Sequence, residues 1–250
     1  MEIKVFKDDR TLSARAADRV CAQLRDKPDS LLCIAAGHSS LGVFQELSRR
    51  AQAGEADFSQ AGFVAMDEWL GMNETDPGSC GDFLRQNFLS QVDIPARRVR
   101  LVDGRAQDPA GECQALRAFI AAEGGIDFLI LGMGMNGHLA LNEPGTDFSL
   151  SVHATTLDSV TQRVGQKYFD PARSAPQLTG GLTIGIADMA AARQVLLLVN
   201  GAKKAPILKE VVESPVTTRL PATALKEMPQ AALWCDQEAA SLCAGLELAQ

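Results

Sequence analysis

The chain has 250 residues, of which 46% are hydrophobic, and it carries a formal net charge of −7 at pH 7. A chain of this length and composition can bury a substantial core. The acidic balance argues against a nucleic-acid-binding protein, which usually presents a basic surface. It does not exclude an anionic small ligand, because a few lysines and backbone amides can hold phosphate locally in an acidic protein.

Sequence features that bear on the compartment point to the cytoplasm. No apolar run approaches the ~20 residues of a membrane span, and the N-terminal stretch lacks the pattern of a signal peptide. The cysteines are scattered without a Cys-x-x-Cys pair, which is typical of reduced thiols; they are Cys21, Cys33, Cys80, Cys113, Cys235 and Cys243. We therefore expect a cytoplasmic protein with neither membrane nor nucleic acid as a partner.

Apolar strand-like runs alternate with helix-like segments along the chain. In chain order, the pattern predicts a strand at 31–35, a helix at 41–51, a strand at 62–66, a helix at 112–122, strands at 126–131, 181–186 and 195–199, a helix at 203–212, a strand at 231–235 and a helix at 237–248. The stretch 150–178 has the weakest pattern, and we expect it to be a lid or a connecting segment.

This alternation predicts the fold class α/β, with three layers and a mostly parallel sheet covered by helices on both faces, as in Rossmann-like folds. No internal repeat or low-complexity linker divides the chain, so we expect a single domain over 1–250. Ligands of such sheets bind beyond the carboxyl ends of the strands, which makes the turns after the strands the places to search for a site.

The first such turn contains Gly37, His38 and Ser39 and opens the helix predicted at 41–51. A glycine allows close approach, hydroxyls donate hydrogen bonds, and a helix N-terminus attracts an anion. The alternative is an ordinary serine cap of the helix. The turn is not a Walker loop, since no Gly-Lys-Ser/Thr follows the glycine.

The second turn begins with Asp67, Glu68 and Trp69, directly after the strand predicted at 62–66. A carboxylate at the end of a strand could act as a general base, with the indole shielding it from water. The alternative is an aspartate that caps a helix beside a solvated glutamate.

The third turn, over 132–144, reads Gly-Met-Gly-Met-Asn-Gly-His-Leu-Ala-Leu-Asn-Glu-Pro and contains one of only three histidines. It places His138 and Glu143 in a glycine-rich loop at the end of a buried strand, which indicates an active site. Asn136 and Asn142 could equally stabilise turns through their side chains. Three unusual turns in one sheet favour a shared site over three coincidences.

These motifs resemble the glucosamine-6-phosphate deaminase/isomerase family and its galactosamine-6-phosphate relatives, over roughly 31–236. The most specific element is Gly-His-x-Ala-x-Asn-Glu-Pro at 137–144. The 6-phosphogluconolactonases of the wider superfamily share the Gly-His but, as a rule, not the Asn-Glu-Pro. The resemblance thus favours a deaminase over the two alternatives, a 6-phosphogluconolactonase and a non-catalytic sugar-phosphate-binding protein.

The resemblance implies deamination and isomerisation of a 2-amino-2-deoxyhexose 6-phosphate to a ketohexose 6-phosphate and ammonia, with no metal or organic cofactor. Asp67 matches the general base that moves the C2 proton to C1. His138 matches the imidazole that transfers a proton at the ring oxygen during ring opening, and Glu143 matches the carboxylate that orients it.

The resemblance also implies how the 6-phosphate is bound. Gly37, His38 and Ser39 fall where the family cradles the phosphate, and Lys204 matches its phosphate-binding lysine. Lys167 falls near an arginine that the family turns toward the phosphate. The alternative for both lysines is a solvated surface cation.

Two departures from the family pattern concern the site itself. Asn136 stands where the glucosamine members usually have an aspartate, and an amide cannot support a protonated His138 by charge. Galactosamine members also read Asn-Gly-His, so both epimers remain candidates for the substrate. His38 replaces a small residue of the phosphate loop.

The oligomeric state is left open, with a homo-oligomer among the alternatives.

Overall fold

The computed structural model describes residues 1–169 and 177–249, and its centre is a parallel sheet of seven strands. The strands lie in the order β1-β10-β9-β6-β2-β3-β5, and every neighbouring pair runs parallel. Their bounds are β1 Glu2–Phe6, β2 Leu31–Ile34, β3 Gly62–Val64, β5 Val99–Arg100, β6 Phe128–Gly132, β9 Gln194–Val199 and β10 Ala231–Asp236. Because all strands point the same way, their carboxyl ends share one edge of the sheet.

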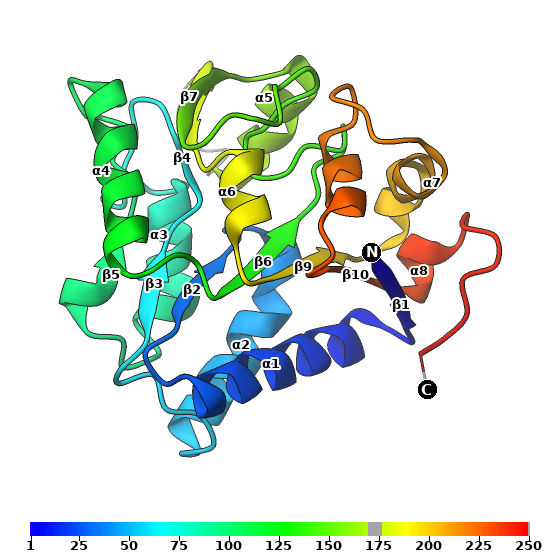
Figure 1. Cartoon of the computed structure of the whole chain (residues 1–250), viewed down its shortest axis with the longest axis horizontal. Coiled ribbons are helices and arrows are strands. Elements are labelled where there is room, and N and C mark those ends of the chain that lie inside the picture. Colours follow the sequence, from blue (N-terminus) through cyan, green and yellow to red (C-terminus); the bar gives the residue numbers. More distant parts are fainter. Residues whose placement is uncertain (170–176, 250) are drawn as a thin grey trace.

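A smaller antiparallel sheet lies beyond that edge (Figure 1). It consists of β4 Asp67–Trp69, β8 Gly180–Thr183 and β7 His153–Thr156, in the order β4-β8-β7. Asp67 pairs with Thr183 across the two strands β4 and β8. The chain therefore leaves the large sheet at the end of β3 and enters the small one after only two intervening residues.

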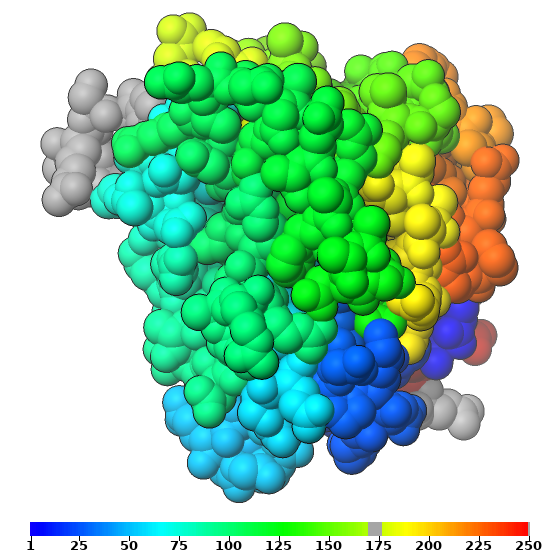
Figure 2. Space-filling model, turned by 60° about the vertical axis from the view of Figure 1, so that its left-hand side comes forward, coloured from blue at the N-terminus to red at the C-terminus, as the bar shows by residue number. Residues whose placement is uncertain are grey.

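Helices cover both faces of the parallel sheet (Figure 1). The long helices α1 Asp9–Asp26 and α2 His38–Gln52 pack together on one face, whereas α4 Pro109–Ala122 and α6 Ile186–Ala191 lie on the other. Shorter helices are α3 Cys80–Leu84, α5 Ser159–Gly165, α7 Ala205–Glu213 and α8 Gln237–Ala240. Figure 2 shows the side of the molecule where α4 forms the surface above the ends of α1 and α2.

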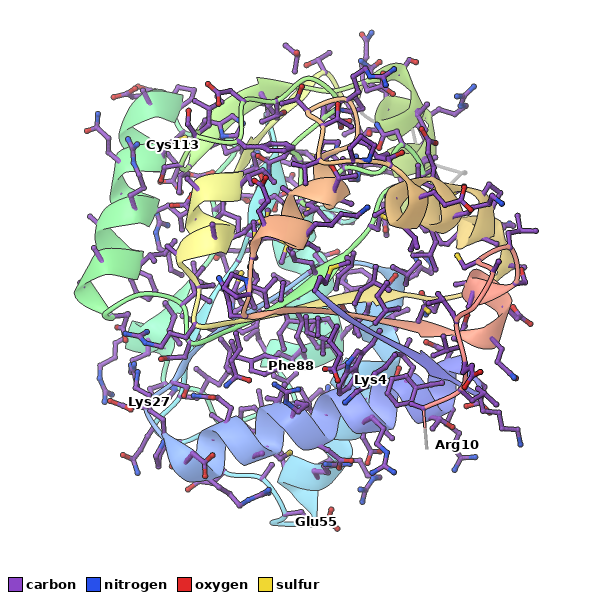
Figure 3. All side chains as sticks on the ribbon, turned by 45° about the vertical axis from the view of Figure 1, so that its right-hand side comes forward. Lys4, Arg10, Lys27, Glu55, Phe88 and Cys113 are labelled. Carbon is purple, nitrogen blue, oxygen red and sulfur yellow. The ribbon has the colours of Figure 1, made fainter. Side chains whose placement is uncertain are left out.

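The core beneath the sheet is closed by a group of phenylalanines. Phe88 is fully buried and contacts the rings of Phe44, Phe58 and Phe63, with ring centroids 4.9 to 5.7 Å apart. Figure 3 shows Phe88 inside the molecule, while Arg10 and Glu55 lie at its surface. Aromatic packing of this kind fixes α2 against the sheet, and with it the turn that precedes α2.

The predicted three-layer, mostly parallel α/β fold is confirmed, with differences in single elements. The strand predicted at 62–66 ends at Val64, and the one predicted at 181–186 is the antiparallel β8. The helix predicted at 237–248 is wrong beyond Ala240, because the following residues are largely exposed and Gly245 has a φ of +79°. No elements were predicted for the first 30 residues, where β1 and α1 lie.

The weakly patterned stretch 150–178 has structure of its own. It contains β7, α5 and a short 3-10 turn at Gln166–Tyr168, and part of it, 170–176, lies outside the described residues. The expectation of a lid stays a prediction.

Within 1–169 and 177–249, no helix has both the length and the apolar character needed to cross a membrane.

Candidate active site

A cavity of about 590 Å³ opens at the carboxyl ends of β2, β6 and β9. The strands β2 and β6 are neighbours in the sheet, but the chain continues from β2 to β3 on one side and from β6 to β9 on the other. The turns that leave β2 and β6 therefore diverge, and a crevice forms between them. Ligands of open α/β sheets bind at such a point.

The three turns singled out in the sequence meet at this cavity. Its wall includes the turn after β2, the start of β4 and the turn after β6. The first and third turns are close enough that a side chain on Gly132 would contact Ser39, 3.7 Å away. The site residues predicted from the sequence that line the cavity are Gly37, His38, Ser39, Asp67, His138, Lys167 and Lys204. Glu143 and Asn136 belong to the same loop as His138 but do not line the cavity. Oε2 of Glu143 lies 3.3 Å from Nδ1 of His138, and Oδ1 of Asn136 accepts from the His138 backbone N–H.

Asp67 is the first residue of β4, and only 8% of its surface is exposed. Burial raises the pKa of its carboxyl to about 6, against the opposing effects of a hydrogen bond from the Cys80 thiol and the charge of His138. A carboxyl with a pKa near neutrality can both accept and return a proton, as a general base must. The indole of Trp69 also lines the cavity, as expected of a group that shields the carboxyl.

Glu68 is buried, so the alternative of a solvated glutamate at this turn is wrong. Its carboxyl accepts hydrogen bonds from the backbone N–H groups of Trp69, Cys80 and Gly81 at 2.8, 3.0 and 2.8 Å. Burial nevertheless raises the pKa of Glu68 to about 7. The contacts tie the start of α3, and thus the Cys80 thiol, to the strand that carries Asp67.

The loop after β6 is shaped to hold one imidazole. A Cβ at Gly134 would lie 2.3 Å from the His138 ring, so only glycine leaves room for it. The Gly134 N–H donates to the carbonyl of His138 at 3.0 Å. The buried Asn142 donates to the carbonyls of Leu139 and Ile184 at 2.9 and 2.8 Å, which fixes the loop to the end of β8.

The contacts of the His138 ring indicate its tautomer. Nδ1 lies 3.3 Å from Oε2 of Glu143 and 3.0 Å from Oγ1 of Thr161. We assign the proton to Nδ1, which leaves Nε2 as the basic nitrogen. Burial alone would raise the pKa of Glu143, but the hydrogen bonds that its carboxyl accepts, that from His138 first among them, lower it below the ordinary value.

Three lysines gather at another part of the same cavity, although the protein is acidic. They are Lys167, Lys203 and Lys204, and none has a carboxylate within ion-pair distance in the part of the chain that the structure describes. Burial, followed by the charge of Lys167, lowers the pKa of Lys204 to about 8, and its ammonium donates to the carbonyl of Met133. Burial and the charge of Lys203 also lower the pKa of Lys167. Of the three side chains, only that of Lys204 is partly buried, whereas Lys167 and Lys203 are exposed. Ammonium groups that gather in this way without carboxylate partners are typical of an anion site.

The N-terminus of α2 faces these lysines without a side-chain cap. The N-cap residue is Gly37, and the alternative of a serine cap finds no support among the described contacts. The hydroxyl of Ser40 is buried without a hydrogen-bond partner among the described residues. The ring of Tyr168 packs near this turn, with its centroid 5.5 Å from that of His38. Burial, then the charge of Lys167, lowers the pKa of His38, so this ring adds no positive charge at neutral pH.

Sequence analysis did not identify several residues of the site. Ser40, Cys80, Thr161, Tyr168 and Lys203 all line the cavity. Thr161 and Tyr168 lie in the stretch with the weakest pattern, and the Cys80 thiol carries no spacing signal at all. Only Ser40 and Lys203, which neighbour predicted residues, could have been found by extending the motifs.

Among the described residues, no three His, Cys, Asp or Glu side chains are placed to hold a metal ion.

Comparison with known proteins identifies the family. The sequence profile of the family described as glucosamine-6-phosphate isomerases/6-phosphogluconolactonase matches residues 7–234. The chain belongs to this family. Two members similar to it are glucosamine-6-phosphate deaminases from Geobacillus sp. (strain WCH70) and Halothermothrix orenii. Each is 35% identical to this chain. The match with the Geobacillus protein covers 92% of this chain and 91% of that protein, and the match with the Halothermothrix protein covers 97% of this chain and 100% of that protein.

Solved structures of the glucosamine-6-phosphate isomerase/6-phosphogluconolactonase family agree with this assignment. A monomeric glucosamine-6-phosphate deaminase superposes with a TM-score of 0.92 at 30% identity and covers 97% of this chain and 100% of its own. The 6-phosphogluconolactonase from Trypanosoma cruzi has a TM-score of 0.75 at 20% identity, with 97% of each chain covered. The second likeness concerns the fold alone.

The buried Asp67 carboxyl should make the protein less stable at neutral pH than its asparagine variant. The pKa of Asp67 is raised from 3.8 to about 6, so the folded state binds a proton at this carboxyl more tightly than the unfolded state does. The stability that this proton contributes is fully present below pH 3.8 and is lost as pH rises through about 6, where the buried carboxyl ionises. The difference corresponds to roughly 3 kcal/mol. Asp67→Asn should therefore raise the melting temperature at pH 8, and the gain should shrink toward pH 5.

Thermal melts of the wild type and Asp67→Asn between pH 5 and pH 8 measure this effect. The exposed Asp93 supplies the matched control, since Asp93→Asn removes a carboxyl that is not buried. A gain for Asp67→Asn that does not vary with pH would contradict the assigned cause.

Proposed function

We propose that this protein deaminates and isomerises a 2-amino-2-deoxyhexose 6-phosphate, yielding a ketohexose 6-phosphate and ammonia. The observation that carries the proposal is the joint placement of Asp67, His138 and the lysine group in one cavity. The names of the similar proteins support it and favour glucosamine 6-phosphate as the substrate. Galactosamine 6-phosphate is the alternative epimer, which the Asn-Gly-His motif favours.

Ring opening is the first step that the site must assist. With Nδ1–H donated to Glu143, Nε2 of His138 can take the proton of the anomeric hydroxyl and return one to the ring oxygen. The charge of Glu143 stabilises the imidazolium that forms between the two transfers. The loss of the ring C–O bond then gives the open-chain amino aldehyde.

Isomerisation of this aldehyde requires a base that faces C2. The Asp67 carboxylate removes the C2 proton while the aldehyde oxygen takes a proton from the substrate's own ammonium group, which gives a 1,2-enolamine. The Asp67 carboxyl then returns its proton to C1, which gives a protonated imine at C2. Water then hydrolyses the imine to the ketone and ammonia. The pKa of about 6 leaves Asp67 ionised at neutral pH and still basic enough for the transfer.

The lysine group and the turn after β2 would hold the 6-phosphate. Lys204 and Lys167 supply charge, while Gly37, His38 and Ser39 begin α2, whose N-terminus favours an anion. A phosphate bound there would also relieve the repulsion among the ammonium groups. This arrangement would anchor one end of the substrate and leave C1 and C2 for the two catalytic groups.

One chain should suffice for this activity, because every group invoked above either lines a single cavity of one chain or, like Glu143, contacts a residue that does. The similar solved deaminase is described as monomeric. A homo-oligomer is thus not required by the proposed mechanism.

An assay of ammonia release tests the proposed function. The purified protein should release ammonia from glucosamine 6-phosphate or galactosamine 6-phosphate, and the ratio of kcat/KM for the two identifies the preferred epimer. A parallel assay with 6-phosphogluconolactone serves as the control and should show no turnover above background. Lactone hydrolysis without ammonia release, or binding of the sugar phosphates without turnover, would overturn the proposal.

Replacement of the base should abolish proton transfer and spare binding. For Asp67→Asn, we expect ammonia release and loss of the C2 proton to fall by roughly a hundred- to ten-thousand-fold, because an amide cannot accept the proton. In the wild type, kcat/KM should fall as pH drops below about 6, where the carboxyl becomes protonated.

Proton exchange at C2 is measured by NMR in D2O, and calorimetric binding of the sugar phosphate shows whether the site remains intact. Asp93→Asn is again the matched control. Ammonia release at the wild-type rate by Asp67→Asn would refute the assigned base.

Removal of the Lys204 charge should weaken substrate binding. For Lys204→Met, we expect kcat/KM to fall by about ten- to a hundred-fold, the usual range for a hydrogen bond to a charged group. Because the pKa of Lys204 is about 8, wild-type kcat/KM should also fall above pH 8, where the ammonium loses its proton. Lys204→Arg should move this alkaline limb upward, since a guanidinium stays charged.

The exposed Lys209 on α7 provides the matched control, because Lys209→Met changes the net charge equally without touching the cavity. An alkaline limb that is the same in Lys204→Arg and the wild type would exclude Lys204 as its source.

A further inference from the structure

The side chain of Asn136 lies between two carboxylates behind the imidazole of His138. Its Nδ2 is 2.7 Å from Oε2 of Glu143, 3.4 Å from Oδ1 of Asp158 and 3.4 Å from Oγ1 of Thr161. Its Oδ1 accepts from the backbone N–H of His138 at 3.2 Å. The amide is therefore fixed in orientation, because a flipped amide would turn its oxygen toward both carboxylates.

Asp158 connects this amide to a second group that contacts the imidazole. It is the N-cap of α5, and its Oδ1 accepts from the N–H of Val160 at 2.8 Å. The first turn of α5 carries Thr161, whose hydroxyl lies 3.0 Å from Nδ1 of His138. Asp158 does not line the cavity, so it can act on the reaction only through Asn136 and Thr161.

The neutral amide of Asn136 complements the negative charge of Asp158. An aspartate at position 136 would bring a third carboxylate to within hydrogen-bond distance of Glu143 and close to Asp158. Like charges at this separation cannot all ionise, so one of the carboxyls would hold a proton or the loop would shift. An amide instead donates N–H to both neighbours and lets Glu143 remain charged.

We propose that Asp158 is a positioning residue of the catalytic site. It holds the amide of Asn136 toward Glu143 and the first turn of α5 against the imidazole, and thereby keeps His138 in the orientation needed for ring opening. This inference rests on the proposed function, because it assigns a role in the same reaction.

A charge exchange between the two positions tests the inference. Asn136→Asp should lower kcat by about ten-fold or more, with KM within about two-fold of the wild type, because the phosphate-binding groups are untouched. Asn136→Asp combined with Asp158→Asn returns the number of carboxylates to two and gives the new carboxylate at position 136 an amide donor on one side, although it still faces Glu143 on the other. Its kcat should therefore be at least about three-fold higher than that of Asn136→Asp, without reaching the wild-type value. Asp158→Ser keeps an N-cap for α5 but loses the charge, and should lower kcat with little change in melting temperature.

The matched control is the exposed Asp147, whose carboxyl accepts from the Ser149 N–H and contacts none of these groups. Asp147→Asn in the Asn136→Asp background removes the same charge and should restore nothing. A double variant no more active than Asn136→Asp, or an equal recovery with Asp147→Asn, would overturn the inference.

Urea unfolding of the wild type, Asn136→Asp, Asp158→Asn and the double variant separates this inference from the proposed function. Asn136→Asp and Asp158→Asn should be non-additive in unfolding free energy, with the double variant more stable than the sum predicts. This coupling does not depend on turnover, so it holds even for a protein that releases no ammonia. Additive effects on unfolding would refute the contact between the two side chains, whatever the activity.

Discussion

Asp67 stands where the chain crosses from the parallel sheet to the antiparallel one, and both sheets must hold for its carboxyl to stay buried. Burial is what raises the pKa of this group, and neither the thiol of Cys80 nor the charge of His138 offsets it fully. The fold therefore carries an uncompensated desolvation cost at the position where the proposed mechanism places a base. Functional sites commonly hold such costs, which the rest of the core must outweigh.

A second set of buried groups restrains the partners of Asp67. The carboxyl of Glu68 fixes the start of α3 through three backbone N–H groups, and the carboxyl of Glu143 fixes the imidazole of His138. Neither carboxylate needs to touch a ligand to matter. Each holds a group that lines the cavity, in the way that outer hydrogen bonds orient the ligands of a metal centre.

The layered fold and the convergence of three turns followed from the sequence because buried parallel strands leave a strong signal. Long apolar runs such as that of β6 cannot lie at the surface, and parallel strands bring their carboxyl ends to one edge. The helix α1 was not predicted because much of its buried face consists of small residues such as Ala16, Ala17 and Cys21. Such residues give only a weak hydrophobic periodicity in a sequence. The small sheet escaped because β4 has only three residues and reads as part of the preceding strand.

The residues of the site also divide into those that the sequence predicts and those that it does not. Asp67, His138 and the turn at Gly37 occupy strand ends, where topology alone predicts a ligand. Thr161, Tyr168 and Asp158 reach the site from a stretch without clear periodicity, and their positions depend on tertiary packing. The orientation of the Asn136 amide likewise depends on Asp158, which is 22 residues away in the chain. Sequence spacing cannot reveal that contact.

The gathering of Lys167, Lys203 and Lys204 has a consequence for the behaviour of the protein in solution. Without an anion among them, mutual repulsion and lost hydration weigh against the folded state. Binding of a small dianion near these lysines should reduce this cost, so the free energy of unfolding should depend on the buffer anion. Inorganic phosphate or sulfate would then act both as a stabilising solute and as a competitor of the sugar.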